Sequence, residues 1–507
     1  GIIKVDLLGL GMMAVLEEAL PLVREHDGVT LDLAHLPPDD PEVYAMLRRA
    51  DTVGVFQVES RAQMATLPRM KPDHFYDLVV EVAIIRPGPI VGKMVHPYLD
   101  RRNQRATVTY PHPSLEPILK RTLGVPLFQE QLLRIAMTVA GFSGGEAEEL
   151  RRAMGFKRSA ERMAKIEQRL YAGMARNGIV GEVADSVVRS ITSFALYGFP
   201  ESHAASFALI AYASSYLKYH HPAAFFAALL NCYPMGFYSP ATLVKDSERH
   251  GAPALPIDVT RSDWLCTLEG AAPQLAIRLG LRYVSGLREE NGRRVEQART
   301  SHPFDSIADF TARVAPNRRE LDALAYAGAF AAFGMTRRDA LWNAAAVERD
   351  PQSLLTGAAP RTAPAPLPKM SPRDETLADY AATGLTTRPH LMSHLRDTLK
   401  AQGVLSAAEL GRARHGDWVK TAGVVIVRQR PGTAKGFLFL TLEDETGIAN
   451  LIVVPDLFQR HRNILRRAGI LLAEGWLQQQ DGVTAIRARR FTELKLDGAL
   501  PPSHDFR

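Results

Sequence analysis

A change in hydrophobic period along the chain limits what it can fold into more than any other feature. Before residue 350 the apolar residues recur mostly at helical spacing, whereas residues 415–491 alternate on a period of two. Between these regions, Asp350–Glu375 is rich in proline and alanine, which predicts a linker. The sequence therefore predicts a multidomain α+β protein with a mainly helical part and a strand-rich C-terminal part.

Composition and charge restrict the class of protein and the partners it can have. A net charge of +6 permits a polyanionic partner. Cys232 and Cys266 lie far apart without a Cys-x-x-Cys motif, so we expect neither a zinc site nor a disulfide framework, and we expect a cytoplasmic location. No apolar run is long enough to cross a membrane. Because the chain begins within a strand pattern and lacks an initiating methionine, we expect it to be a fragment of a longer protein.

The opening stretch, GIIKVDLLGLG, contains the first candidate catalytic group. A strand here would place Lys4 and Asp6 on one face. Asp6 is a candidate metal ligand, because divalent metal ions take hard oxygen ligands and two-metal phosphoryl transfer needs several carboxylates. A solvated Lys–Asp pair is the alternative for this stretch taken alone.

Two arginines in the following helical region are candidates for phosphate contacts. Arg61 follows a strand-like GVFQV segment, and Arg86 precedes a Pro-Gly-Pro turn. An arginine on a rigid turn can clamp phosphate, because its planar fork loses little freedom on binding. The alternative for Arg86 is a buried guanidinium that holds loop carbonyls.

A second cationic segment lies on a helix that the sequence predicts directly. Ser143 and Glu146 have the spacing of a capping box, which predicts a helix beginning just after Ser143. Arg151 and Arg152 flank the apolar stripe of this helix, where they form either a triphosphate-binding edge or a solvated face. Further along, His203 opens a helix of small apolar residues and either satisfies a loop or contacts a ligand.

Residues 256–349 have the pattern of two short helix pairs. The turn at residues 284–287 is expected to expose backbone N–H groups, and Arg288, Arg293 and Arg294 follow on the next helix. Backbone amides and helix N-termini can hold DNA phosphates without recognising a base sequence. We therefore predict a DNA-binding region here.

The period-two region has the order expected of a five-stranded barrel of the oligonucleotide-binding (OB) type, with one helix near residues 456–467. On this prediction Arg428, Arg430 and Lys435 lie on a loop between strands and contact DNA. Phe437 and Phe439 either stack on bases or belong to the core.

Several sequence motifs occur in an order that resembles the bacterial C-family DNA polymerases, the polymerase III alpha-subunit family, over nearly the whole chain. They are KVDLLGLG, GVFQVESR, RPGP, PHPSLEPIL, FQEQ, ELRRAMG and YGFPESHAASFALIAYASSYLKYHHPAAF. By overall likeness and its short C-terminal end, the chain is most similar to the error-prone branch of this family. The resemblance implies the end of a palm domain at 1–20, fingers at 21–255, a tandem helix-hairpin-helix region at 256–349, a linker at 350–398 and an OB domain at 399–507.

The resemblance also implies roles for the candidate residues. Asp6 corresponds to the third catalytic carboxylate of the palm, which holds two Mg²⁺ ions together with upstream carboxylates, and Lys4 is its basic neighbour. Arg151 and Arg152 correspond to arginines that meet the triphosphate of the incoming nucleotide. The remaining positions, which line the nucleotide and primer–template cleft, are Arg61, Arg86 and His203.

The implied activity is DNA-directed DNA synthesis of the error-prone, damage-induced kind, on primer–template DNA with deoxynucleoside triphosphates. Accessory mutagenesis proteins are implied as partners. The segment Gln352–Thr356 lacks the aromatic anchor of a clamp-binding peptide, which disfavours direct sliding-clamp binding. No Asp-x-Asp segment precedes Asp6 and the family's N-terminal phosphoesterase-like domain is absent, so we expect the fragment alone not to polymerise.

Other functions remain open at this stage. The chain could belong to a main replicative alpha subunit, or to a non-catalytic DNA-binding scaffold. A nucleic-acid ligase fits poorly, because its nucleophilic lysine lies in Lys-x-Asp-Gly and here Leu7 follows Asp6.

Overall fold

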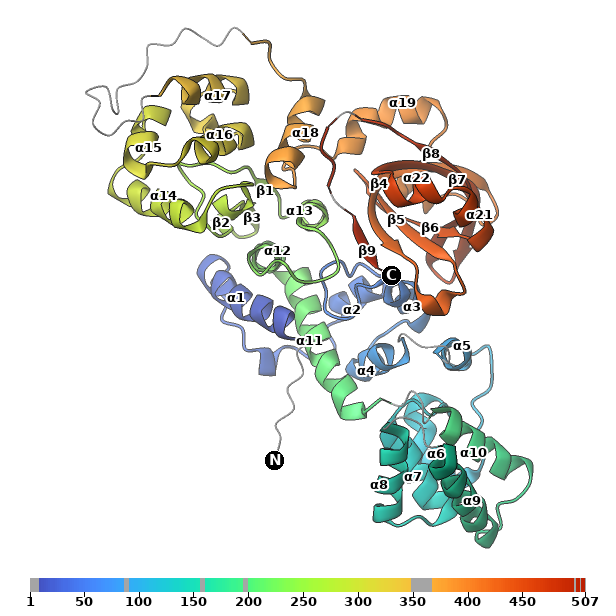
Figure 1. The fold of residues 1–507 in the computed structure, drawn as a ribbon. Coiled ribbons are helices and arrows are strands. Elements are labelled where there is room, and N and C mark those ends of the chain that lie inside the picture. Colours follow the sequence, from blue (N-terminus) through green and yellow to red (C-terminus); the bar gives the residue numbers. More distant parts are fainter. Residues whose placement is uncertain are drawn as a thin grey trace. The chain divides into compact units, whose positions relative to one another are not determined.

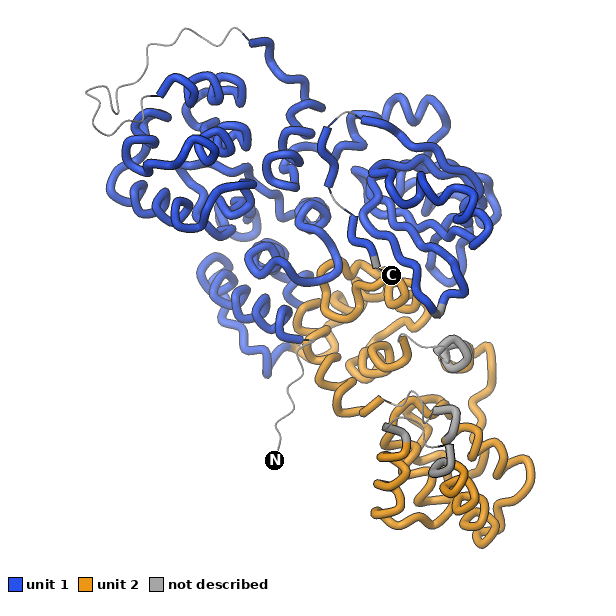
Figure 2. The backbone as a smooth tube through the Cα atoms, in the orientation of Figure 1, with its two compact units in different colours: residues 1–36, 216–507 blue, residues 37–215 orange. Residues whose placement is uncertain are grey.

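The structure, a computed structural model, describes residues 9–85, 91–155, 160–194, 199–347, 367–496, 498–501 and 503–506. The chain forms two compact units, one of residues 37–215 and one of residues 1–36 with 216–507 (Figure 2). Within the described residues, no helix combines the length and apolarity that crossing a lipid bilayer requires.

The unit of residues 37–215 is helical (Figure 1). Its α-helices are α2 (Pro41–Arg48), α3 (Arg61–Met70), α4 (Phe75–Ile84), α5 (Val91–Arg102), α6 (Glu116–Leu119), α7 (Gln129–Ala140), α8 (Gly144–Gly155), α9 (Ala160–Arg176) and α10 (Glu182–Phe194). The long helix α11 (Glu201–His220) begins in this unit. Short 3-10 turns are η2 (Pro113–Leu115) and η3 (Lys120–Thr122).

Local hydrogen bonds explain where these helices begin. Asp40 caps α2 by accepting from the backbone N–H of Glu42 at 2.9 Å. The predicted capping box of α8 is confirmed, because Ser143 N–H donates to Glu146 at 2.8 Å and Glu146 N–H donates to Ser143 Oγ at 3.3 Å. The GVFQV segment, expected to be strand-like, instead forms turns between α2 and α3.

The other unit begins with α1 (Leu10–His26) and the turn η1 (Leu33–His35), and continues after α11 with α12 (Pro222–Asn231) and α13 (Pro240–Arg249). A small sheet follows, in which β3 (Gln274–Arg278) lies between β1 (Ala254–Leu255) and β2 (Thr267–Ala271). The two predicted helix pairs are then confirmed as α14 (Glu289–Ser301), α15 (Ile307–Val314), α16 (Arg318–Ala327) and α17 (Arg337–Ala346), with 3-10 turns η4 (Leu281–Tyr283) and η5 (Ala331–Phe333).

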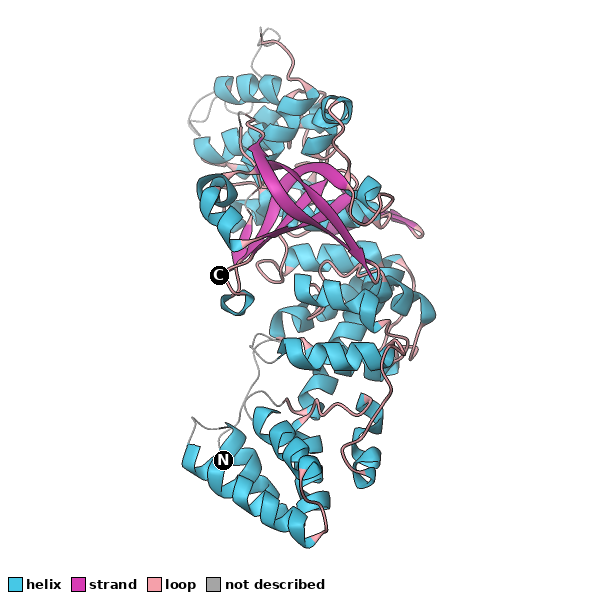
Figure 3. Ribbon diagram, turned by 90° about the vertical axis from the view of Figure 1, so that its right-hand side faces the viewer, coloured by secondary structure: helices cyan, strands magenta, loops and turns pink. Residues whose placement is uncertain are grey.

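A closed barrel forms the C-terminal part of the same unit. Its strands are β4 (Trp418–Gln429), β5 (Leu438–Asp444), β6 (Gly447–Val453), β7 (Ile470–Gln480) and β8 (Val483–Glu493), in the order β5-β6-β8-β7-β4 with β4 returning to β5. Figure 3 shows these strands crossing steeply as they wind around one core, as in a tilted barrel. A short strand, β9 (His504–Phe506), pairs with β4 in parallel. The predicted five-stranded barrel of the OB type is therefore confirmed.

Two details differ from the sequence prediction. The single helix expected between the third and fourth barrel strands is two short helices, α21 (Pro455–Arg460) and α22 (Arg462–Arg467). The segment 350–398 is not linker throughout, because it contains α18 (Pro372–Thr383) and the 3-10 turn η6 (Leu391–Leu395), and α19 (Arg396–Ala401) and α20 (Ala407–Leu410) follow before the barrel. A further turn, η7 (Gly432–Ala434), lies between β4 and β5. Tyr380 of α18 is buried, and tertiary packing of this kind is invisible in a proline-rich composition.

Buried ion pairs connect helices α13 and α19 with the end of barrel strand β5. Glu443 accepts from Arg249 at 2.8 Å and from the Thr242 hydroxyl at 3.1 Å, and only 3% of its side chain is exposed. Next to it, Asp444 accepts from Arg396 at 3.0 Å and is also buried. Burial raises the pKa of Glu443 to about 7, although the neighbouring Arg249 guanidinium acts in the opposite direction.

This pKa predicts a pH dependence of stability. Because the folded pKa of Glu443 is raised above its unfolded value of 4.5, its contribution to stability is present at low pH and is lost as pH rises through about 7. Between about pH 5 and about pH 8, the unfolding free energy of the unmodified chain should therefore fall by an amount on the order of 2–3 kcal/mol. In Glu443→Gln this fall should be absent, because the amide does not titrate. Urea unfolding at several pH values measures it. The control is Glu445→Gln, in the turn that follows β5. Equal pH slopes for Glu443→Gln and the unmodified chain would show that the carboxyl of Glu443 does not titrate in this range.

Candidate nucleic-acid interface

Three of the predicted site residues lie outside the described part of the chain. They are Lys4, Asp6 and Arg86. Their roles as catalytic neighbour, metal ligand and nucleotide contact therefore stay predictions.

Helix α8 presents Arg151 and Arg152 on its surface. Glu148 holds both guanidiniums, since it accepts from Arg151 Nη2 at 2.7 Å and from Arg152 Nε at 3.1 Å. These hydrogen bonds lower the pKa of the Glu148 carboxyl to about 2. The two arginines are largely exposed, at 48% and 75% of their side-chain surface. They are thus positioned side by side by one carboxylate, and an incoming anion would have to compete with it.

Arg61 and His203 begin helices of the same unit. Arg61 is the first residue of α3, whose N-terminus is capped by Ser60. His203 lies in the first turn of α11, and its ring packs against those of Phe199 and Phe207 with centroid separations of 4.8 and 4.2 Å. Contacts with two aromatic rings restrict the orientation of the imidazole, and its role as a nucleotide contact stays a prediction.

In the helix-hairpin-helix region, the predicted arginines are anchored by acidic neighbours. Arg288 donates to Glu320 at 2.9 Å, Arg293 approaches Glu289 at 3.2 Å, and Arg294 approaches Glu290 at 3.0 Å. Arg288 keeps 64% of its side chain exposed, so its outer nitrogens face solvent. In the Arg293 and Arg294 pairs both partners are exposed, so these pairs are individually weak and leave the guanidiniums accessible to a phosphate.

The sequence did not point to Glu320, which organises this region. Its carboxylate is almost fully buried and accepts from Asn291 Nδ2 at 2.6 Å and from the backbone N–H of Asn317 at 3.0 Å, besides Arg288. Burial would raise the pKa of Glu320, but these hydrogen bonds outweigh burial and lower it. Its position in the Asn317 capping box is visible in the sequence, whereas its burial between α14 and α16 is not.

The predicted turn at residues 284–287 is present, with Gly286 at a φ of 90°. Three of its four backbone N–H groups are already hydrogen-bonded, however. Val284 N–H donates to the carbonyl of Leu281 at 3.0 Å, Ser285 N–H to that of Ala382 in α18 at 2.9 Å, and Leu287 N–H to that of Val284 at 3.1 Å. The expectation that this turn exposes its backbone N–H groups is therefore wrong for these three.

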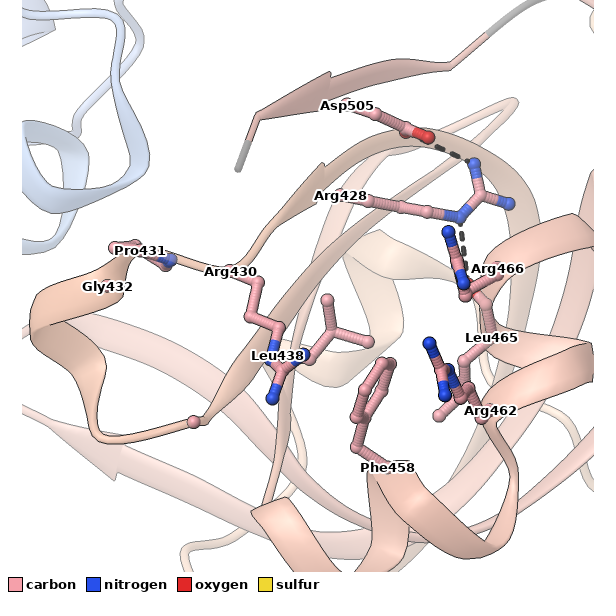
Figure 4. A pocket seen from close by; sticks show the side chains of 11 residues that line it. Arg428, Arg430, Pro431, Gly432, Leu438, Phe458, Arg462, Leu465, Arg466 and Asp505 are labelled. Atoms are coloured by element: carbon pink, nitrogen blue, oxygen red, sulfur yellow. Dashed lines mark hydrogen bonds and ion pairs between the residues drawn. The ribbon is translucent and has the colours of Figure 1, made fainter.

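The three basic residues expected on a barrel loop have different positions. Arg428 lies on strand β4 and is buried; its Nε donates to the carbonyl of Leu465 at 2.9 Å, and its Nη1 lies 3.4 Å from Asp505 (Figure 4). Loss of solvation lowers the pKa of its guanidinium. Arg428 is therefore a structural residue, contrary to the prediction that it lies on a loop and contacts DNA. Arg430 and Lys435 do lie between β4 and β5 and are exposed.

Comparison with known proteins shows which families two parts of the chain resemble. Residues 12–178 match the bacterial DNA polymerase III alpha subunit finger domain, and residues 251–340 match a helix-hairpin-helix motif. The error-prone DNA polymerase of Anaeromyxobacter dehalogenans strain 2CP-1 is 50% identical over 519 residues, which cover 99% of this chain and 45% of the relative. The chain belongs to the error-prone branch of the bacterial C-family DNA polymerases.

Two further relatives agree with this assignment. The error-prone DNA polymerase of Mycolicibacterium paratuberculosis is 50% identical over 509 residues, with 100% of this chain and 46% of the relative covered. That of Methylococcus capsulatus is 48% identical over 531 residues, covering 100% and 50%. The chain thus spans about half the length of the curated relatives that it matches. The predicted membership of the C family and of its error-prone branch is confirmed.

In this error-prone family member, the barrel also carries a surface that the sequence analysis missed. Trp418 and Trp476 face each other on β4 and β7, with ring centroids 5.0 Å apart and exposed fractions of 41% and 44%. Arg487 on β8 is paired with Trp476 in the same row and is exposed. Exposed aromatic rings beside a cation are the means by which barrels of this type stack bases. The sequence did contain a signal for this surface, because both tryptophans occupy outward-facing positions in strands whose residues alternate between core and solvent.

The α8 geometry yields a prediction for nucleotide use. In the intact protein, Arg151→Ala with Arg152→Ala should raise the nucleotide KM and lower kcat, because the triphosphate loses two charge-assisted donors. Primer–template affinity should stay nearly unchanged, as should the melting temperature, since both side chains are exposed. Steady-state primer extension measures the first effect and anisotropy of labelled DNA the second.

The matched control removes two exposed arginines from the neighbouring helices α9 and α10, Arg176→Ala with Arg189→Ala. A collapse of DNA affinity in the α8 variant would identify Arg151 and Arg152 as backbone contacts instead.

Proposed function

We propose that the intact protein is a DNA-directed DNA polymerase that extends a primer on damaged or undamaged template. The observation that carries this proposal is the identity of about half of all aligned residues, over essentially the whole chain, with proteins named error-prone DNA polymerase. The finger-domain and helix-hairpin-helix matches support it, because a nucleotide-binding and a DNA-binding part occur together in the expected order.

In the proposed reaction the primer 3′-hydroxyl attacks the α-phosphorus of a deoxynucleoside triphosphate and pyrophosphate leaves. Asp6 would hold divalent metal, in our proposal Mg²⁺, which supplies charge stabilisation at the attacking and leaving oxygens. Arg151 and Arg152 orient the triphosphate and neutralise its charge, so they act by positioning and electrostatics. Arg61, Arg86 and His203 line the same cleft in this proposal, and Lys4 neighbours the metal ligand.

Among the described residues, one acidic cluster that could resemble a metal site is unsuited to the role. Asp73, His74 and Asp77 lie close together, but Arg102 approaches Asp77 at 2.6 Å and makes two hydrogen bonds to its carboxylate. A carboxylate already held by a guanidinium is a poor ligand for a cation, so the proposed metal ion is assigned to Asp6 and not to this cluster.

DNA would be held by the helix-hairpin-helix arginines and by the barrel. We further propose that the protein works in the cytoplasm with accessory mutagenesis proteins, in keeping with the error-prone branch. The segment Gln352–Thr356, considered for sliding-clamp binding, lies outside the described residues.

Asp6→Asn tests the polymerase proposal, because it keeps the shape of the side chain and removes its charge. In the intact protein, primer extension should fall by at least about a thousandfold while primer–template affinity survives, since a metal ligand is lost and no DNA contact is. Extension at the full rate would mean that the carboxylate is structural. It would also favour the rival function, a non-catalytic DNA-binding scaffold.

The helix-hairpin-helix arginines should dominate the salt dependence of binding. Arg288→Ala with Arg293→Ala should weaken duplex binding at low salt and reduce the slope of log affinity against log salt by about 1–2, as expected for losing one or two phosphate contacts. Titrations at several NaCl concentrations measure the slope. Arg176→Ala with Arg189→Ala is again the charge-matched control, and an unchanged slope in the Arg288/Arg293 variant would contradict the assignment.

A further inference from the structure

A pocket lies at the end of the barrel where the β4–β5 connection, α21, α22 and β9 meet (Figure 4). Its volume is about 710 Å³, which is within the size range of small-molecule sites. Its apolar wall is formed by Leu438, Phe458 and Leu465. It is also lined by four arginines, Arg428, Arg430, Arg462 and Arg466, and by one carboxylate, Asp505.

The charges of this pocket are not balanced. The carboxylate of Asp505 is committed, because it lies 3.4 Å from Arg428 Nη1 and accepts from Ser503 Oγ at 2.8 Å. Within the described part of the chain, Arg430, Arg462 and Arg466 form no ion pair. Their guanidiniums point toward the same space from two different segments of the chain (Figure 4). The pocket therefore concentrates positive charge that the described protein does not neutralise.

One arginine side chain and the helix that carries two others are held in place before any ligand arrives. Arg430 lies over the ring of Phe458, with its guanidinium carbon 4.6 Å from the ring centroid. Arg462 and Arg466 are one turn apart on α22, so they share a face of that helix. The buried Arg428 donates to the carbonyls of Leu465 and Ala468 and thereby ties the end of α22 to strand β4. Arg430 therefore has little freedom to lose on binding, and the backbone that carries Arg462 and Arg466 is anchored.

Converging guanidiniums in a concave pocket suit one class of ligand. Their planar forks match phosphate oxygens bidentately. A phosphodiester within a strand carries one charge and follows an open groove, whereas a phosphate monoester or pyrophosphate carries close to two charges on a compact end with three free oxygens. A pocket lined by three guanidiniums that form no ion pair within the described chain favours the compact end.

We propose that this pocket binds a terminal phosphate, either the 5′-phosphate of a nucleic-acid strand or free pyrophosphate. The ligand would approach Arg430, Arg462 and Arg466, while Arg428 and Asp505 maintain the wall. This proposal does not depend on the polymerase activity proposed above, because its test measures binding alone. A bound anion would also offset the repulsion between Arg462 and Arg466. Like charges four residues apart on a helix are unfavourable without such an anion.

The test uses the 507-residue chain in EDTA, so that no metal-dependent binding contributes. Two labelled single-stranded oligonucleotides of identical sequence, one with a 5′-phosphate and one with a 5′-hydroxyl, are titrated by anisotropy. Thermal melts with and without inorganic pyrophosphate run in parallel. The variant is Arg462→Ala with Arg466→Ala, and the matched control is Arg460→Ala with Arg467→Ala, which removes equal charge from α21 and α22 outside the pocket lining.

The unmodified chain and the control should bind the 5′-phosphorylated strand about tenfold more tightly than the 5′-hydroxyl strand, or should be stabilised by pyrophosphate, and the pocket variant should show neither. Discrimination between strands identifies a strand end as the ligand, and stabilisation by pyrophosphate alone identifies the free anion.

Equal binding of both strands together with no effect of pyrophosphate would overturn the proposal, and so would equal losses in the variant and the control. If Arg462→Ala with Arg466→Ala unfolds the chain, Arg462→Lys with Arg466→Lys keeps the charges without the forks and should lose most of the discrimination.

Discussion

Two buried carboxylates at the end of strand β5 fix how the barrel packs against the helices that precede it in the chain. Glu443 receives Arg249 of α13 and Asp444 receives Arg396 of α19, so two elements distant in sequence are tied to one strand end. Such pairs add little net stability compared with apolar packing, but leaving one partner buried without the other is costly. Their main effect is therefore specificity, since a shifted barrel would leave charges buried and unpaired.

A similar use of carboxylates recurs in the helix-hairpin-helix region. Glu320 is buried and joins α14 to α16, whereas Glu289 and Glu290 are exposed and only steady the arginines beside them. A pair between two buried side chains fixes the fold, whereas an exposed guanidinium stays accessible to a phosphate because pairs at the surface are weak.

The proposed sites follow this division. Arg151, Arg152, Arg293 and Arg294 are paired with exposed carboxylates, whereas Arg288 combines a largely exposed side chain with the buried carboxylate of Glu320. The barrel pocket differs, because its exposed arginines converge without a carboxylate to share. In our proposals the α8 and helix-hairpin-helix surfaces bind the nucleotide and DNA, and the pocket is a third site that takes a compact anion.

Much of the architecture followed from the sequence alone, because helix starts, turns and strand periods are encoded within a few neighbouring residues. The capping box at Ser143, the helix pairs and the closed barrel were all predictable in this way. The burial of Arg428 was not, since its partners at Leu465 and Asp505 come from segments 37 and 77 residues away. Nor was helix α18 inside the expected linker, or the convergence of Arg430 with Arg462. The sequence by itself determined the order of the elements and the family, while only the tertiary structure decided which charges are buried, because burial is set by contacts between distant segments.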